Sequence, residues 1–97
     1  MIKHVVCFKL DNPTNELLEK TKNILLSMKG NVPMLRDIEV GVDFLHSPRS
    51  YDIILIVKLD DKKALDEYQN DPYHCDVVKR HMHSVAVSSI ALDWELD

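Results

Sequence analysis

A run of five consecutive apolar residues, 53–57, constrains the fold of this chain more than any other feature. Successive side chains of a strand point to opposite faces, so both faces of this segment are apolar. One face carries Ile53, Leu55 and Val57, and the other carries Ile54 and Ile56. Such a strand has to be covered on both sides, and we predict a central strand over 51–59.

Three further strands are predicted over 2–10, 38–44 and 85–95. Segment 38–44 alternates apolar residues, ending with Phe44, with polar ones, which is typical of a half-solvated edge strand. The short polar link 46–50 then has a length suited to an antiparallel hairpin, so we expect 38–44 to pair with 51–59.

A first helix is predicted between these strands, with Asn12 as N-cap and Pro13 at the first helical position. It should stop near Lys29, because Gly30 tolerates the left-handed conformation that ends helices. The residues at helical spacing on its apolar face are Leu17, Leu18, Thr21, Ile24, Leu25 and Met28.

A second helix is predicted after 51–59, with Asp60 or Asp61 as its cap, and it is interrupted at 70–72. Asp71 then caps a second segment that opens with Pro72. One face of that segment carries His74, Val77, Val78, His81 and Met82.

The order strand, helix, strand therefore occurs twice in one domain that spans residues 1–97. This order predicts an α+β fold, in which a four-stranded antiparallel sheet carries both helices on one face and strands 2–10 and 51–59 are central. The outer face of these central strands carries Val5, Cys7, Ile54 and Ile56. No third helix is predicted to cover this apolar face, so we expect a homodimer that packs sheet against sheet.

Composition excludes several classes of function. Twelve Lys and Arg against 16 Asp and Glu leave a net charge of −4, which does not favour nucleic acid or an anionic membrane as partner. The longest apolar run is far shorter than the ~20 residues of a membrane span, and the charged N-terminal residues do not resemble a signal peptide, so we expect a cytoplasmic protein. Cys7 and Cys75 are expected to stay reduced.

Neither a metal site nor a cofactor is predicted. His81 and His83 point to different sides of a helix, and His74 and Cys75 lie about two turns away, so no spacing gathers three ligands. The chain lacks a glycine-rich phosphate loop and a serine or cysteine nucleophile with a patterned partner. We interpret the basic residues of the second helical region as a solvated face; they are Lys62, Lys63, Lys79 and Arg80.

Three residues are candidates for acid/base chemistry. His74 lies in the first turn of the restarted helix, where the helix dipole disfavours the imidazolium, so a neutral imidazole could serve as general base. Tyr68 could direct its hydroxyl at the same space, and His4 lies on the strand face that meets the helices. Each also has a structural interpretation: a helix-cap hydrogen bond for His74, core packing for Tyr68, and a satisfied core histidine for His4.

The chain resembles the stress-responsive A/B barrel, or Dabb, family over essentially its whole length. The matching features are the opening segment 2–9, the segments 34–41 and 51–53, the motif 68–74 (Tyr-Gln-Asn-Asp-Pro-Tyr-His), and Asp93-Trp94 near the end. The resemblance implies a ferredoxin-like βαββαβ fold that forms a dimeric α+β barrel, with a pocket between sheet and helices in each subunit.

The same resemblance implies a small apolar or carbonyl-containing ligand. Plant members of the family include a polyketide cyclase that closes a ring by aldol condensation, and its catalytic residues match His74 as base, Tyr68 as donor and His4 as a further pocket histidine. The pocket would be lined by Val6, Phe8, Leu25 and Val78, and Leu25 stands on a helix where the cyclase has a pocket tyrosine. Two alternatives stay open: a non-catalytic stress-associated protein and a cofactor-independent monooxygenase.

Overall fold

The structure, a computed structural model, describes residues 1–96 and contains the predicted succession of elements. Strands and helices follow one another as β1 (Ile2–Leu10), α1 (Asn15–Leu26), β2 (Asp37–Val42), β3 (Ile53–Leu59), α2 (Lys62–Gln69), the π-helix η1 (His74–Lys79), α3 (Arg80–Val85) and β4 (Ala86–Glu95). None of these helices has the length and apolar character needed to cross a membrane. The βαββαβ order of a ferredoxin-like α+β domain is confirmed.

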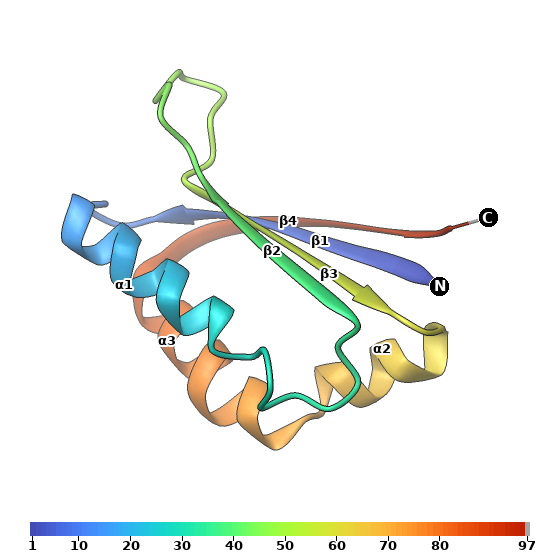
Figure 1. Ribbon diagram of the computed structural model, residues 1–97. Coiled ribbons are helices and arrows are strands. Elements are labelled where there is room, and N and C mark those ends of the chain that lie inside the picture. Colours follow the sequence, from blue (N-terminus) through green and yellow to red (C-terminus); the bar gives the residue numbers. More distant parts are fainter. Residues whose placement is uncertain (97) are drawn as a thin grey trace.

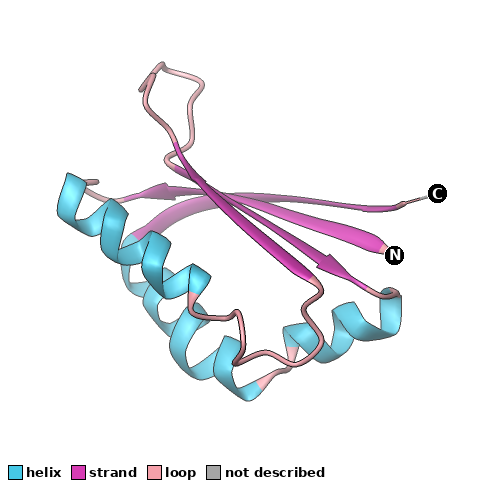
Figure 2. Ribbon diagram, viewed as in Figure 1, coloured by secondary structure: helices cyan, strands magenta, loops and turns pink. Residues whose placement is uncertain are grey.

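The four strands form one antiparallel sheet in the order β2-β3-β1-β4, so β1 and β3 are central as predicted. All helices lie on one face of this sheet, and its other face is uncovered (Figures 1 and 2). Pairing of His4 with Val57 and of Val6 with Leu55 aligns the apolar positions of both central strands on the helix side. The core forms between this face and the helices.

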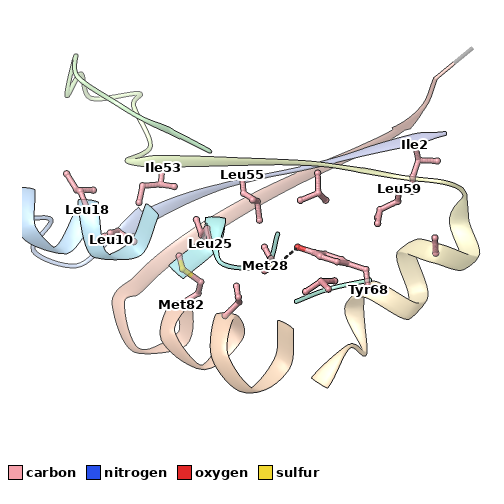
Figure 3. Packing of buried hydrophobic residues seen from close by; sticks show 14 residues of the cluster. Ile2, Leu10, Leu18, Leu25, Met28, Ile53, Leu55, Leu59, Tyr68 and Met82 are labelled. Carbon is pink, nitrogen blue, oxygen red and sulfur yellow. Dashed lines mark hydrogen bonds between the residues drawn. The ribbon is translucent and has the colours of Figure 1, made fainter. Parts of the chain in front are cut away.

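The core is built mainly from β3, α1 and the second helical region (Figure 3). Alternate residues of β3 are buried beneath the helices, which explains why one face of its apolar run is hidden. Leu25 and Met28 are fully buried together with Tyr68, so the C-terminal part of α1 and the turn after it pack against α2. This packing holds the helices at a fixed position over the sheet.

The first helix begins later and ends earlier than predicted. Asn12 adopts a left-handed backbone conformation with φ of 50°, so it cannot be the N-cap. Thr14 takes that role, and its Oγ1 accepts a hydrogen bond from the Leu17 amide at 3.1 Å. The helix ends at Leu26, and Gly30 adopts the predicted left-handed conformation, φ 85°, in the turns that follow.

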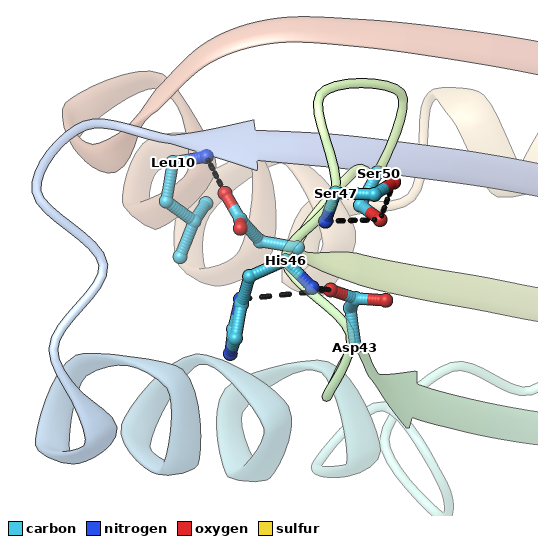
Figure 4. A network of polar contacts seen from close by, with 6 residues as sticks. Leu10, Asp43, His46, Ser47 and Ser50 are labelled. Atoms are coloured by element: carbon cyan, nitrogen blue, oxygen red, sulfur yellow. Dashed lines mark hydrogen bonds and ion pairs between the residues drawn. The ribbon is translucent and has the colours of Figure 1, made fainter.

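The connection between β2 and β3 is longer than the predicted link and extends away from the helices (Figure 1). Strand β2 ends at Val42, so Phe44 lies outside the sheet and is 89% exposed, which corrects its predicted place in the strand. Side-chain contacts replace strand pairing here: the Asp43 carboxylate accepts from the His46 amide, and the Ser47 and Ser50 hydroxyls are bonded to each other (Figure 4).

The restarted helix is capped as predicted but differs in its winding. Asp71 accepts a hydrogen bond from the His74 amide through Oδ2 at 3.0 Å. Residues His74–Lys79 form a π-helix, whose turns are wider than those of an α-helix. His74, Val78 and Met82 are buried, whereas Val77 is 39% exposed, so its predicted place on the buried face is wrong.

Asp61, one of the two predicted caps, accepts from the Ala64 amide at 2.8 Å. We expect Asp61→Ala to lower the free energy of unfolding by about 1 kcal/mol, because it leaves an amide of the first turn without its partner. Urea denaturation of Asp61→Ala and of Asp66→Ala, which removes an exposed carboxylate from the middle of α2, measures this effect. Equal stability of the two variants would show that the cap contributes nothing.

Candidate functional site

A cavity of about 700 Å³ lies between the helical layer and the β1–β4 half of the sheet. Its walls come from β1, β3, β4 and the second helical region. The lining residues are His4, Val6, Phe8, Leu55, Tyr68, Gln69, His74, Val78, Lys79, Met82, His83, Ala86, Val87, Ser88, Ser89 and Ala91. A largely apolar wall with a few polar groups is typical of small-molecule sites, and the volume lies within their usual range.

His74 is fixed at the cavity wall by two hydrogen bonds. Its amide donates to the Asp71 carboxylate, and its ring Nδ1 lies 3.0 Å from the Tyr68 carbonyl oxygen. A carbonyl oxygen can only accept, so Nδ1 carries the proton in this bond. In the neutral ring, Nε2 is then left with a lone pair.

Burial is the main reason why the pKa of His74 falls to about 4, and the nearby positive charge of Lys79 lowers it further. The Tyr68 carbonyl and the Asp71 carboxylate oppose this shift without cancelling it. Within residues 1–96 no buried side-chain nitrogen or oxygen lacks a hydrogen-bond partner, and Nε2 has none, so this atom reaches the cavity. At neutral pH His74 therefore presents a proton acceptor to the cavity.

His4 lies at the same end of the cavity and is held by an acidic partner. Its Nδ1 is bonded to the Asp93 carboxylate, across the β1–β4 pair in which these two residues face each other. The His4 side chain is buried, whereas that of Asp93 is 42% exposed. Nε2 of His4 is left for a ligand, and it donates a hydrogen bond whenever the ring is an imidazolium.

Tyr68 joins the two histidines through its ring. The ring stacks on that of His74 with centroids 4.2 Å apart, and His4 meets it edge-on at 5.8 Å. The hydroxyl points away from this cluster and donates to the sulfur of Met28 at 3.7 Å, within the core (Figure 3). Burial raises the pKa of the Tyr68 phenol, and the Asp71 carboxylate adds to this shift. The predicted direction of the hydroxyl toward the site is therefore wrong in this structure.

The structure brings together three of the four residues predicted to line the pocket. Val6, Phe8 and Val78 contribute to the cavity wall. Leu25 does not, because its side chain is completely buried in the core on α1. The correction has a simple cause: the cavity lies over β1 and β4, whereas α1 packs over β2 and β3.

Comparison with known proteins agrees with the fold. Residues 2–96 match the family described as Stress responsive A/B Barrel Domain, or Dabb. The chain belongs to the Dabb family. No curated protein sequence matches it.

Several solved structures share the fold of this Dabb domain. A dimeric ferredoxin-like protein of unknown function from Bacteroides fragilis is 24% identical, with a TM-score of 0.82 over 98% of this chain and 95% of that one. A Dabb family protein from Mesorhizobium loti is 21% identical, with a TM-score of 0.75 over 98% and 95%. A hydroxynitrile lyase from Passiflora edulis is 10% identical, with a TM-score of 0.81 over 99% and 93%.

Two residues of the candidate site, Asp93 and Lys79, were not predicted from the sequence. Asp93 pairs with His4 because the two residues face each other in the β1–β4 register. They lie 89 positions apart in sequence, so no local pattern shows the pair. Lys79 was assigned to a solvated helix face. It is instead half-buried, lines the cavity and donates from Nζ to the Gln69 carbonyl at 2.9 Å.

The residues predicted for a dimer interface share the outer face of the sheet. Val5 and Cys7 of β1 lie opposite Ile56 and Ile54 of β3, and all four are partly buried. Burial raises the pKa of the Cys7 thiol. Strand β4 extends this face with three exposed residues, Ile90, Leu92 and Trp94.

Acid should destabilise this Dabb domain through His74. Its pKa of about 4 in the folded state lies below the ordinary value of 6.5, so the unfolded chain binds more protons between these values. The free energy of unfolding should therefore fall by about 2 to 3 kcal/mol as pH drops from 6.5 to 4. Burial also lowers the pKa of His81, so His81 adds to this loss of stability. Denaturation as a function of pH, compared between wild type and His74→Asn, measures the share of His74. If the free energy of unfolding of His74→Asn depends on pH as steeply as that of the wild type, His74 does not cause the loss of stability in acid.

Proposed function

We propose that this Dabb domain binds a small carbonyl compound in its cavity and uses His74 to remove a proton from the carbon beside the carbonyl group. One observation carries the proposal. The bond between Nδ1 of His74 and the Tyr68 carbonyl fixes the tautomer in which Nε2 is free to accept a proton, and burial keeps the ring neutral at physiological pH. A buried histidine with a purely structural role does not need a ring nitrogen that is left free to accept a proton.

His4 supplies the second group of this chemistry. Removal of the proton leaves negative charge on the carbonyl oxygen, and a hydrogen-bond donor at that position lowers the barrier. The His4 ring is oriented by Asp93 through Nδ1 at the same end of the cavity as His74, and it can donate from Nε2 when both ring nitrogens carry a proton. We assign this role to His4 in place of Tyr68, since the Tyr68 hydroxyl is engaged with Met28.

The resulting enolate is the intermediate of aldol-type reactions, in which it attacks a second carbonyl carbon. The resemblance of segment 68–74 to the plant cyclase motif supports a reaction of this class. A hydroxynitrile lyase from Passiflora edulis has the same fold, so this architecture accommodates a lyase in another protein. We therefore propose a lyase or cyclase activity of the aldol type.

We also propose that the functional unit is a homodimer. At its centre the outer sheet face carries apolar residues of β1, β3 and β4, flanked by Lys3, Lys9 and Lys58. The helices cover only the opposite face. Monomeric proteins seldom expose a continuous apolar surface of this kind. Structural neighbours of this chain are dimeric, which supports a dimer that covers this face and so completes an α+β barrel.

A non-catalytic, stress-associated role is the second candidate, and one observation favours it. His4 joins β1 to β4 through Asp93, and His74 joins the π-helix to α2 through the Tyr68 carbonyl, so both histidines also stabilise the fold. In that case the dimer itself would be the functional object.

Proton exchange at a model ketone separates the two candidates. We expect the wild-type protein to accelerate the exchange of the methyl protons of 4-acetylbenzamide for deuterium in D₂O, followed by NMR at pD 7. Bovine serum albumin at the same concentration controls for nonspecific catalysis. Exchange no faster than in that control, with the probe shown by NMR shift changes to occupy the cavity, would favour the non-catalytic role.

A further inference from the structure

The cavity wall has an uneven distribution of charge. Among its lining residues within 1–96, Lys79 is the one lysine or arginine, and no aspartate or glutamate is present. The other polar groups are His4, His74 and His83, two serines and Gln69. The described part of the wall therefore offers a fixed positive charge and hydrogen-bond donors to a ligand, without a carboxylate to balance them.

The π-helix explains why Lys79 belongs to this wall. In an α-helix, residues five apart are rotated by about 140°, so a lysine at position 79 would point away from the side on which His74 lies. The wider π-helical turn pairs residues i and i+5, which places His74 and Lys79 at the two ends of η1 on the same side. Such π-helical turns are frequently found at functional sites.

The Lys79 ammonium group is held near the cavity with part of its hydrogen-bonding capacity unused. One of its three donors is bonded to the Gln69 carbonyl, and Lys79 forms no ion pair within the described residues. A half-buried ammonium without an anionic partner has lost water without gaining a counter-charge. A ligand carboxylate would provide that missing partner.

We infer that the cavity selects a carbonyl compound that also carries a carboxylate, and that Lys79 binds the carboxylate while His74 and His4 face the reacting end. This inference rests on the proposed function and specifies its substrate class. The carboxylate interacts with Lys79 through charge-assisted hydrogen bonds, which are stronger than those between neutral groups. The apolar wall formed by Val6, Phe8 and Val78 contacts the carbon skeleton of the ligand.

A bound carboxylate also acts on the base. The charges that His74 experiences come from Lys79 and His4, which disfavour its protonation, and from Asp71, which favours it. An anion placed at Lys79 offsets the positive charge that lowers the pKa of His74 most, so His74 becomes a better proton acceptor when the matching substrate is present. The same contact thus contributes to selectivity and to reactivity.

Binding of two matched probes tests this inference. We expect 4-acetylbenzoate to bind wild-type protein about tenfold more tightly than 4-acetylbenzamide, as measured by NMR titration at pH 7 and low salt. Lys79→Gln should abolish the preference for the benzoate, so that both probes bind this variant with similar affinity. Lys79→Arg should keep a preference for the benzoate, and Lys29→Gln, which removes an exposed lysine outside the cavity, should behave as wild type.

Each other outcome has a definite meaning. Equal binding of both probes to the wild type, with cavity residues shifted, overturns the assignment of a carboxylate and leaves the proposed function in place. A preference for the benzoate that survives in Lys79→Gln overturns the role of Lys79. Failure of both probes to bind the folded wild-type protein at millimolar concentration overturns the inference together with the small-molecule pocket on which it rests.

Discussion

Replacing Ile56 by aspartate is expected to convert a dimer of this protein into monomers. Ile56 lies on the outer face of β3 next to Val5, at the centre of the surface that we propose a second copy covers. In the dimer the new carboxylate would be buried without a partner, which costs several kcal/mol per subunit. Sedimentation velocity should show a mass of 11.2 kDa in place of twice that value.

Asn23→Asp provides the matched control for this experiment. It adds the same carboxylate on an exposed position of α1, on the opposite side of the sheet, and should leave the dimer intact. The melting temperature of Ile56→Asp should fall and lose its dependence on protein concentration, because dissociation and unfolding are no longer linked. A wild-type protein that sediments as a monomer at tens of micromolar would contradict the dimer directly.

The exposed residues of β4 strengthen the case for a partner on this face. Leu92 is 65% exposed, Ile90 52% and Trp94 41%. Leu92 and Ile90 lie beside the outer-face residues Val5 and Cys7 of β1, and Trp94 lies beside Lys3. A tryptophan and two aliphatic side chains in one strand would make this edge prone to nonspecific association if it stayed open. The connection between β2 and β3, which carries the exposed Phe44 and Leu45, adds two more apolar groups away from the helices.

The sheet could be predicted from the sequence because both of its determinants are local. The alternation in 2–10 and the doubly apolar run 53–57 define which side of each strand is buried, and the order of elements then leaves one arrangement with two central strands. The N-cap of the first helix was harder to predict. Asn12 and Thr14 are both good capping residues, and the left-handed backbone that excludes Asn12 as the cap has no signature in the local sequence.

The candidate site was predicted only in part, for two physical reasons. Apolar residues three to four apart are compatible with an α-helix and with a π-helix, so the sequence placed Val77 inside and Lys79 outside, whereas the wider turn reverses both. The partner of a buried polar group depends on three-dimensional contacts. Neither the pairing of His4 with Asp93 nor that of the Tyr68 hydroxyl with Met28 can be deduced from spacing.

Two substitutions at neighbouring side chains should differ strongly in their effect on ketone proton exchange. His74→Asn removes the base but places an amide nitrogen near the position of Nδ1, where it can still donate to the Tyr68 carbonyl. We expect the exchange rate of 4-acetylbenzamide to fall by a factor of about 10² or more, since this is the lower range of what a positioned general base contributes. Tyr68→Phe removes only a hydroxyl that faces Met28 in the core, so the rate should stay within about twofold of wild type.

The comparison of these variants decides which group acts on the carbonyl oxygen. If the hydroxyl of Tyr68 were the donor, as the cyclase resemblance implies, Tyr68→Phe would lower the rate nearly as much as His74→Asn, and His4→Phe would have little effect. Our assignment predicts the reverse order, with His4→Phe reducing exchange strongly because the donor paired with Asp93 is lost. Urea denaturation of each variant separates these effects from instability: Tyr68→Phe should lose at most about 1 kcal/mol, because the bond to sulfur is weak. If Tyr68→Phe has wild-type stability but a strongly reduced exchange rate, the Tyr68 hydroxyl must leave Met28 when a ligand binds. The role of hydrogen-bond donor would then belong to Tyr68.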